Sequence, residues 1–128
     1  MASKFATVIN CIDGRVQQPV NDWMKSKTGA EFIDVITEAG PDKIMASTST
    51  ASRLILKRIL ISRDLHKSKE IAIIAHADCA GNPVSKAIHL EHLRKAAKII
   101  ETWNLEMTIM TAWVGEDCQV QLISEINP

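Results

Sequence analysis

Hydrophobic positions along this chain of 128 residues alternate between short continuous runs and longer stretches with helical spacing. Short apolar runs that are rich in β-branched residues and end at polar residues predict buried strands. Apolar residues three and four positions apart predict helices that bury one face. The predicted strands cover residues 5–10, 30–37, 71–75, 107–114 and 120–123, and the predicted helices cover residues 19–27, 47–64 and 83–103.

This order of elements, β-α-β-α-β-α-β-β, is typical of the α/β class. Strands that alternate with helices form a mostly parallel central sheet with helices on both faces, which makes three layers. We expect about four parallel strands, with the last strand added as an antiparallel edge through a tight connection at residues 115–117. No repeat, low-complexity tract or linker divides the sequence, so we expect a single domain over residues 1–128.

Charge and composition exclude several classes of function. The chain has 15 basic and 15 acidic residues, so its net charge does not indicate a nucleic acid or an anionic membrane as partner. No apolar run approaches the roughly 20 residues that span a bilayer, and the N-terminus lacks a secretory pattern. Three cysteines are an odd number, and two of them lie in polar motifs, which argues against a disulfide framework. We therefore expect a cytoplasmic protein.

The helix predicted over residues 47–64 indicates self-association. Its apolar side chains cover more than one face of the helix, and such a helix has more than one surface to bury. They are Leu54, Ile55, Leu56, Ile59, Leu60 and Ile61. Zero net charge also gives little repulsion between copies. We expect a homodimer or a larger homo-oligomer.

Two polar clusters, each directly after a predicted strand, carry the candidate chemistry. The first cluster begins with Cys11 and contains Asp13 and Arg15, and the second contains His76 and Cys79. Two thiolates and one imidazole are a common ligand set for zinc. Three protein ligands leave one coordination position for water or for another protein group, which distinguishes catalytic zinc sites from closed structural ones.

The topology predicts that the two clusters meet. Both follow strands of a parallel sheet, so both lie at the carboxyl edge. If the chain places its second strand on one side of the first and its third strand on the other side, the first and third strands are neighbours. The crevice between them is then the topological switch point, where open α/β sheets bind their ligands.

These motifs resemble those of the β-class carbonic anhydrases. The resemblance rests on Cys-x-Asp-x-Arg from Cys11 and His-x-x-Cys from His76, and on an Ala-Gly segment that ends at Gly40. It covers roughly residues 5–114. The chain length and the Gly-Asn-Pro that begins at Gly81 look more like a small, compact branch, usually described as putative carbonic anhydrases. Ala80 follows Cys79 where the family usually has glycine.

The resemblance implies a function and a role for each motif residue. It implies reversible hydration of carbon dioxide to bicarbonate, with one zinc per subunit bound by Cys11, His76 and Cys79. In the family, the residue that corresponds to Asp13 is either held by the arginine or is itself the fourth zinc ligand in a closed state. Zinc lowers the pKa of bound water to roughly 7, and Arg15 would keep Asp13 ionised and directed at that water.

We also expect substrate contacts at two glycines. Backbone N–H groups around Gly81, near the start of the predicted helix at residues 83–103, could stabilise the developing charge of bicarbonate. Gly40, in the Ala-Gly segment, is the second candidate.

Alternatives from other classes remain open. One is a hydrolase of carbon disulfide or carbonyl sulfide with the same fold. Another is a non-catalytic zinc-binding or bicarbonate-sensing protein, and a third is a metal-free interaction module. We interpret His89 and His92 as residues of a solvated helix face, Asp78 as a cap of the turn or of the following helix, and Cys118 as a free thiol on the edge strand.

Overall fold

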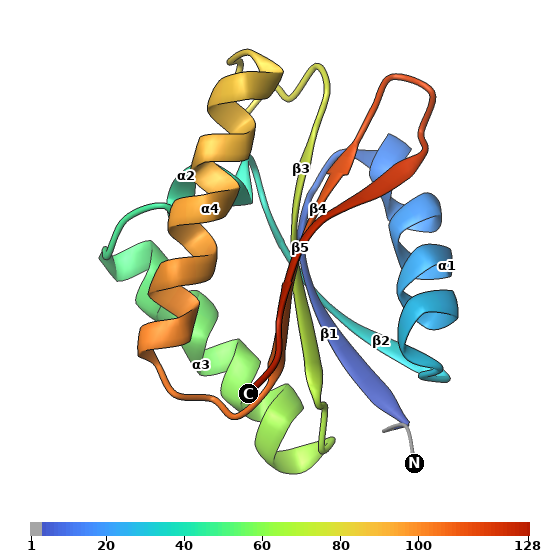
Figure 1. The fold of residues 1–128 in the computed structure, drawn as a ribbon, viewed down its shortest axis with the longest axis vertical. Helices are drawn as coiled ribbons and strands as arrows, with labels where there is room; N and C mark the ends of the chain where they lie inside the picture. Colours follow the sequence, from blue (N-terminus) through green and yellow to red (C-terminus); the bar gives the residue numbers. More distant parts are fainter. Residues whose placement is uncertain (1–3) are drawn as a thin grey trace.

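The sheet of the computed structural model, which describes residues 4–128, is mixed and has five strands in the order β2-β1-β3-β4-β5 (Figure 1). β2, β1, β3 and β4 run parallel to one another, and β5 is antiparallel to β4. The strands are β1 (Phe5–Cys11), β2 (Phe32–Glu38), β3 (Glu70–His76), β4 (Thr108–Val114) and β5 (Val120–Ile126). The predicted α/β class, with its parallel sheet and antiparallel edge strand, is therefore confirmed.

Helices cover both faces of this sheet. α1 lies on one face, whereas α2, α3 and α4 lie on the other (Figure 1). The helices are η1 (Gly14–Val16, a 3-10 turn), α1 (Gln17–Thr28), α2 (Pro41–Met45), α3 (Thr50–Leu65) and α4 (Lys86–Thr102). In the described residues no helix is both long and apolar enough to cross a membrane.

The helix ends differ from the predicted ones because capping side chains set them. Ser49 and Ser52 form a capping box, so α3 begins at Thr50 instead of at residue 47. The side chain of Ser85 accepts a hydrogen bond from the backbone N–H of Ile88, which places the start of α4 three residues after the predicted start. The five-residue helix α2 is too short to show helical periodicity, and it was not predicted.

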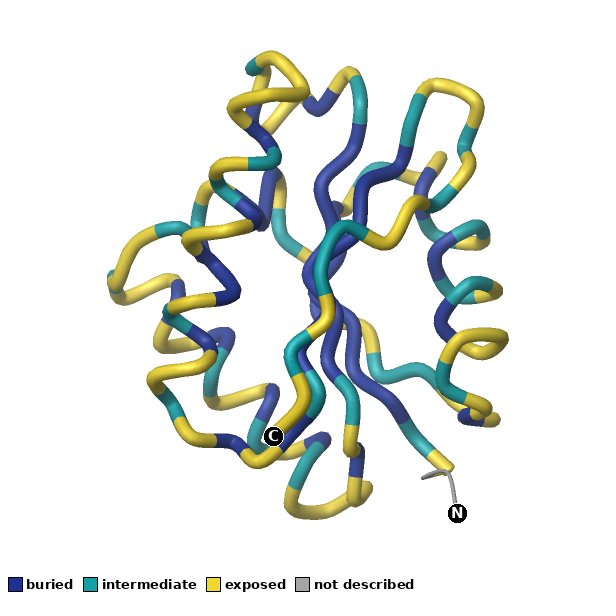
Figure 2. The backbone as a smooth tube through the Cα atoms, in the orientation of Figure 1, coloured by how far each residue is buried: buried dark blue, intermediate teal, exposed yellow. Residues whose placement is uncertain are grey.

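Alternate residues of the central strands pack into two separate cores. Along β3, Ile71 and Ile73 face α3 and α4, and Ala72 and Ile74 face α1. Figure 2 shows the buried residues concentrated in the central strands and on the inner sides of the helices. A strand buried on both faces reads as a continuous apolar run, which is why β3 is so clear in the sequence.

The order of the strands creates a switch point between β1 and β3. The chain leaves β1 to form β2 on one side, crosses back through α3, and forms β3 on the other side of β1. Cys11 and His76 are the last residues of these two neighbouring strands. The first and third strands are thus neighbours, as predicted.

Candidate metal centre

The first cluster is shaped by a 3-10 turn that follows directly on β1. The Asp13 carboxylate caps this turn by accepting a hydrogen bond of 2.9 Å from the backbone N–H of Arg15. The side-chain amide of Gln17 donates to the carbonyl oxygens of Cys11 (2.6 Å) and Asp13 (2.8 Å). Backbone and side-chain hydrogen bonds therefore fix the path of the chain from the cysteine to the arginine.

The orientation of His76 leaves one ring nitrogen available to a ligand. Its Nδ1–H donates to the carbonyl oxygen of Ala77 at 2.8 Å, so the lone pair of the neutral ring is on Nε2. Nε2 is buried and has no hydrogen-bond partner in the described residues. A buried polar atom without a partner is costly, and a metal ion is one group that satisfies an imidazole lone pair.

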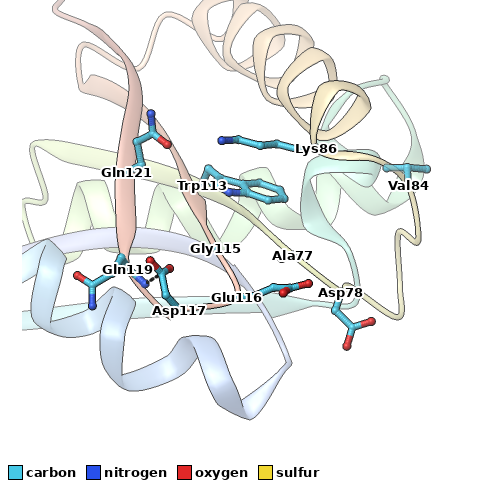
Figure 3. Close-up of a pocket in the computed structure, with 10 residues that line it drawn as sticks. All are labelled: Ala77, Asp78, Val84, Lys86, Trp113, Gly115, Glu116, Asp117, Gln119 and Gln121. Carbon is cyan, nitrogen blue, oxygen red and sulfur yellow. Dashed lines mark hydrogen bonds between the residues drawn. The ribbon is translucent and has the colours of Figure 1, made fainter.

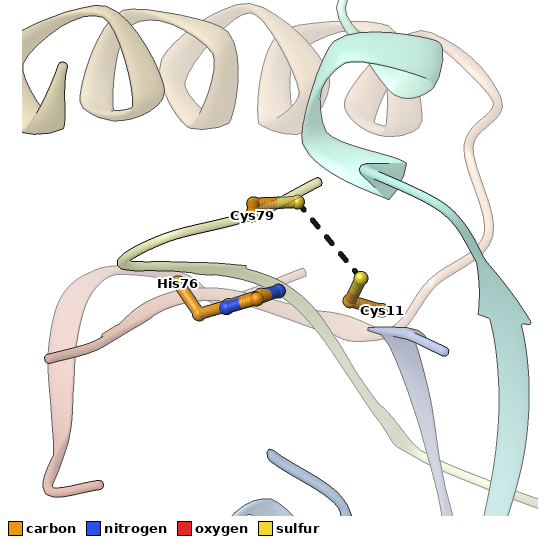
Figure 4. Close-up of side chains that lie close together, drawn as sticks. All are labelled: Cys11, His76 and Cys79. Carbon is orange, nitrogen blue, oxygen red and sulfur yellow. Dashed lines mark hydrogen bonds between the residues drawn. The ribbon is translucent and has the colours of Figure 1, made fainter. Parts of the chain in front are cut away.

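The two cysteines and the histidine meet at the switch point (Figure 4). Cys11, His76 and Cys79 are each at most 3% exposed, and their ligand atoms all lie within 4.8 Å of one another. The two Sγ atoms are 3.9 Å apart. Two Zn–S bonds of about 2.3 Å at a tetrahedral angle place the sulfurs about 3.8 Å apart, so the spacing fits zinc. No fourth Cys, His, Asp or Glu of residues 4–128 joins this cluster.

The protein environment alone disfavours the thiolate form of Cys79. Burial raises the pKa of its thiol, the nearby Cys11 adds to this, and backbone N–H groups of Asn82 and Gly81 act in the opposite direction. A cation bound among Cys11, His76 and Cys79 would supply the charge that stabilises both thiolates.

Asp13 and Arg15 form a two-pronged ion pair beside this cluster. The guanidinium donates from Nε to Oδ1 (3.0 Å) and from Nη2 to Oδ2 (2.7 Å) of the carboxylate. These side-chain hydrogen bonds, followed by the one from the backbone N–H of Arg15, hold the pKa of Asp13 well below its usual range. Asp13 is therefore ionised at neutral and mildly acidic pH.

Arg15 also joins the two clusters. Its guanidinium donates to the side chain (3.3 Å) and to the backbone carbonyl oxygen (3.1 Å) of Asp78. Asp78 has a left-handed backbone, with φ of 55°, at the turn that leads from His76 to Cys79. The predicted role of Asp78 as a turn residue thus omits its contact with Arg15, because nothing in the sequence pairs two residues 63 positions apart.

A pocket of about 270 Å³ lies beside the cluster, and its lining includes Arg15, His76, Asp78 and Cys118. A larger pocket of about 670 Å³ lies around Trp113 and Lys86 (Figure 3). The two pockets are adjacent because they share four lining residues, namely Ala77, Asp78, Gly115 and Glu116. Cys118 is a free, half-buried thiol in the loop before β5, slightly short of the edge strand itself.

Gly40 and Gly81 contact each other through their backbones. A Cβ atom on Gly81 would lie 2.4 Å from the carbonyl carbon of Ala39, and one on Gly40 would lie 2.7 Å from the carbonyl carbon of Gly81. Gly40 also has a φ of +65°, which disfavours other residues. Both glycines are therefore required by this contact, and their role in binding substrate remains a prediction.

The interpretation of His89 as a solvated residue is wrong. His89 is 1% exposed and its Nδ1 lies 2.6 Å from the carboxylate of Asp42, which is also buried. The side chain of His92 is 20% exposed and lies beside the buried Asn82. His89 precedes the buried Leu93 by four residues and so shares its face of α4. Only the fold shows that the Asp42 carboxylate lies next to it on that face.

The fold and the cluster together define an α/β protein of the β-carbonic anhydrase type. The chain is similar to the carbonic anhydrase from Glaciozyma antarctica, with a TM-score of 0.63 and 16% identity over 96% of this chain and 83% of that one. For β-carbonic anhydrase isoform I from Trichomonas vaginalis, the TM-score is 0.63 at 16% identity, over 95% and 84% of the two chains. A tetrameric β-carbonic anhydrase from Sordaria macrospora gives 0.54 at 12% identity, over 98% and 83%.

A family model described as "Putative carbonic anhydrase" matches residues 1–124. The chain therefore belongs to that family, and the resemblance drawn from the two motifs is confirmed. No curated protein matches the sequence.

Proposed function

We propose that this protein is a zinc-dependent carbonic anhydrase that catalyses the reversible hydration of carbon dioxide to bicarbonate and a proton. The observation that carries the proposal is the unpartnered Nε2 of His76, which faces two buried thiols in a chain of this family. Cys11, His76 and Cys79 would hold one zinc ion per subunit. Two sulfurs and one imidazole nitrogen suit zinc, and hard cations such as magnesium prefer oxygen ligands.

The proposed chemistry needs little beyond this centre and the ion pair next to it. Bound zinc supplies a water whose pKa is lowered to about 7, which makes a nucleophile available near neutrality. Asp13 would accept a hydrogen bond from that nucleophile and orient it. Arg15 engages both carboxylate oxygens, which keeps Asp13 ionised and outside the ligand cluster. This arrangement favours an open fourth position over a closed state in which Asp13 is a ligand.

We further propose that the protein is a homodimer or a larger homo-oligomer in the cytosol. Five large apolar side chains are exposed on the edge strand β2 and on α3, and water-exposed apolar groups of this size favour burial against a second copy. They are Phe32, Val35, Leu54, Ile61 and Leu65. Sedimentation at micromolar concentration tests this, and a monomer of 14.2 kDa would refute it.

The experiment that tests the function measures zinc content and stopped-flow hydration of carbon dioxide on one preparation. We expect one zinc per chain and a rate that rises from about pH 6.5 to about pH 9 as the nucleophile forms. A zinc-loaded protein without activity even above about pH 8.5 would instead favour a non-catalytic binding protein. Faster turnover of carbon disulfide or carbonyl sulfide would reassign the substrate.

A further inference from the structure

A buried polar cluster lies next to the candidate metal centre and is used by none of the chemistry above. It consists of Asp42 at the start of α2, Asn82 in the loop after Cys79, and His89 and His92 on α4, and we refer to it as the Asp42 cluster. Asp42, Asn82 and His89 are each at most 1% exposed. The cluster joins the start of α2 to the loop after Cys79, 40 positions later in the sequence, and to α4.

The Asp42 carboxylate determines how this cluster is arranged. A carboxylate removed from water is costly unless it is paired and hydrogen-bonded. One of its oxygens accepts from Nδ1–H of His89 at 2.6 Å and from the amide Nδ2–H of Asn82 at 3.0 Å. The second amide hydrogen of Asn82 points to Nδ1 of His92, 2.9 Å away. Both donors of the Asn82 amide are thus used, and its side chain is held from two sides.

Asn82 carries this restraint to a metal ligand. Its backbone N–H donates to the carbonyl oxygen of Cys79 at 3.3 Å and closes the turn that contains the cysteine. The turn also packs tightly against the start of α2, since the backbones of Gly40 and Gly81 leave no room for a Cβ atom. A displacement of Asp42 or Asn82 is therefore passed on to the turn.

We propose that Asp42 is a positioning residue for the metal centre, which holds Asn82 and the turn of residues 79–82 where Cys79 meets Cys11 and His76. The inference rests on the metal centre proposed above. A preorganised ligand does not have to be ordered when the metal binds, so groups behind the ligands raise metal affinity without touching the metal.

The test compares zinc affinity in three variants of the full chain, by competition with a chelator. Asp42→Asn removes the charge that holds Asn82, and Asn82→Ala breaks the link but leaves the pair of Asp42 and His89 intact. We expect both variants to bind zinc about 10- to 100-fold more weakly than the wild type. Asp34→Asn is the matched control, because Asp34 also pairs with a histidine and a buried hydroxyl but contacts no ligand loop. Its zinc affinity should stay within about twofold of the wild type.

A second readout separates positioning from general destabilisation. The absorption spectrum of the Co²⁺-loaded protein reports ligand geometry, and we expect it to shift in Asn82→Ala and to be unchanged in Asp34→Asn. If Asp42→Asn does not fold, the zinc affinity and Co²⁺ spectrum of Asn82→Ala test the proposal. Unchanged affinity and spectrum in Asn82→Ala would overturn the proposal, and so would an equal loss of affinity in Asp34→Asn. A wild type that binds zinc but does not hydrate carbon dioxide would refute only the proposed activity, whereas one that binds no zinc would refute both.

Discussion

Two aspartate–histidine pairs in this protein have the same chemistry but lie in different environments. Asp42 and His89 are 2.6 Å apart and both side chains are 1% exposed. Asp34 and His66 are 2.7 Å apart, but their side chains are 26% and 41% exposed. The first pair lies behind the turn of Cys79, and the second lies where the edge strand β2 meets the end of α3.

The difference shows how burial changes what one ion pair does. Asp34 keeps water as an alternative partner and also accepts from the hydroxyl of Ser62, so losing its histidine costs little. Asp42 is not accessible to solvent, so water cannot replace a lost partner, and its partners His89 and Asn82 are also buried. A buried pair therefore fixes the positions of the segments that it joins, whereas an exposed pair at the sheet edge contributes little to stability.

The largest expected effect comes from removing the metal. It should change the region around Asp42 and leave the region around Asp34 unchanged. Cys79→Ser should abolish stoichiometric zinc binding, because two ligands hold the ion poorly, and should lower Tm by about 10–15 °C relative to the zinc-loaded wild type. Metal analysis and calorimetry measure both. Hydrogen exchange should increase around Asn82 and Asp42 but not around Asp34.

Cys118→Ser is the control for this variant, because Cys118 is a free thiol outside the ligand cluster. We expect Cys118→Ser to bind one zinc per chain and to have the same Tm as the zinc-loaded wild type. Equal losses in the two serine variants would show that Cys79 acts as a buried side chain and not as a ligand.

The next effect tests the comparison directly, in zinc-free protein. Asp42→Ala removes the carboxylate that accepts from the buried His89 and from one amide hydrogen of Asn82, and we expect it to reduce the free energy of unfolding by about 3–5 kcal/mol. Asp34→Ala should cost about 1 kcal/mol or less. Urea denaturation of both variants gives the two values, and similar values would contradict the argument from burial.

A third prediction concerns Asp13, an ion-paired carboxylate at the metal centre itself. Asp13→Asn should retain zinc and lower kcat by about 10- to 100-fold, because the amide orients the nucleophile poorly. Since Arg15 holds the pKa of Asp13 well below its usual range, Asp13 stays charged through mildly acidic pH. We therefore expect any loss of wild-type activity between about pH 8 and about pH 6 to come from the proposed zinc-bound water, since zinc lowers the pKa of such a water to about 7.

Asp78→Asn is the matched control, because Asp78 accepts from the same guanidinium but not with the same two-pronged geometry. We expect its kcat to stay within about threefold of the wild type. Wild-type turnover in Asp13→Asn would remove Asp13 from the mechanism.

The smallest expected effect is at Glu70, a carboxylate at the start of β3 with one buried oxygen that lacks a hydrogen-bond partner in the described residues. Burial raises its pKa, so the folded state binds its proton more readily than the unfolded state does. Glu70 therefore costs no stability below its ordinary pKa of about 4.3, and the cost appears as pH rises through the raised pKa. Glu70→Gln should raise Tm by about 1–2 °C at pH 7 and have no effect at about pH 4.

Glu91→Gln gives the opposite sign and serves as the control. Arg94 lowers the pKa of Glu91, so this carboxylate stabilises the folded state above its ordinary pKa, and the contribution is lost on acidification. Thermal unfolding of both variants between about pH 4 and about pH 7 checks the signs. A decrease in Tm for Glu70→Gln at pH 7 would contradict the argument that one buried carboxylate oxygen of this half-buried residue lacks a partner among residues 4–128.

The parts of the fold that were predictable are those with a local physical cause. β3 is apolar on both faces, and α1 is capped by Gly29, whose left-handed backbone is typical of a glycine that follows a helix. α2 was missed because five residues make little more than one turn. His89 was assigned to the solvated face because histidine is polar, but it lies on the buried face of α4.

The candidate ligand set is visible in the sequence because two thiols and an imidazole directly after two strands are a common ligand set for zinc, and parallel strands bring such residues to one edge. The sequence thus predicts the α/β class and the family, which are confirmed, and it indicates Cys11, His76 and Cys79 as candidate metal ligands, which the fold brings together. Only the tertiary structure decided that Arg15 connects the two clusters and that Asp42 is buried behind Cys79. Those contacts join residues 40 to 63 positions apart, and a hydrogen bond at such a separation leaves no periodic trace along the chain.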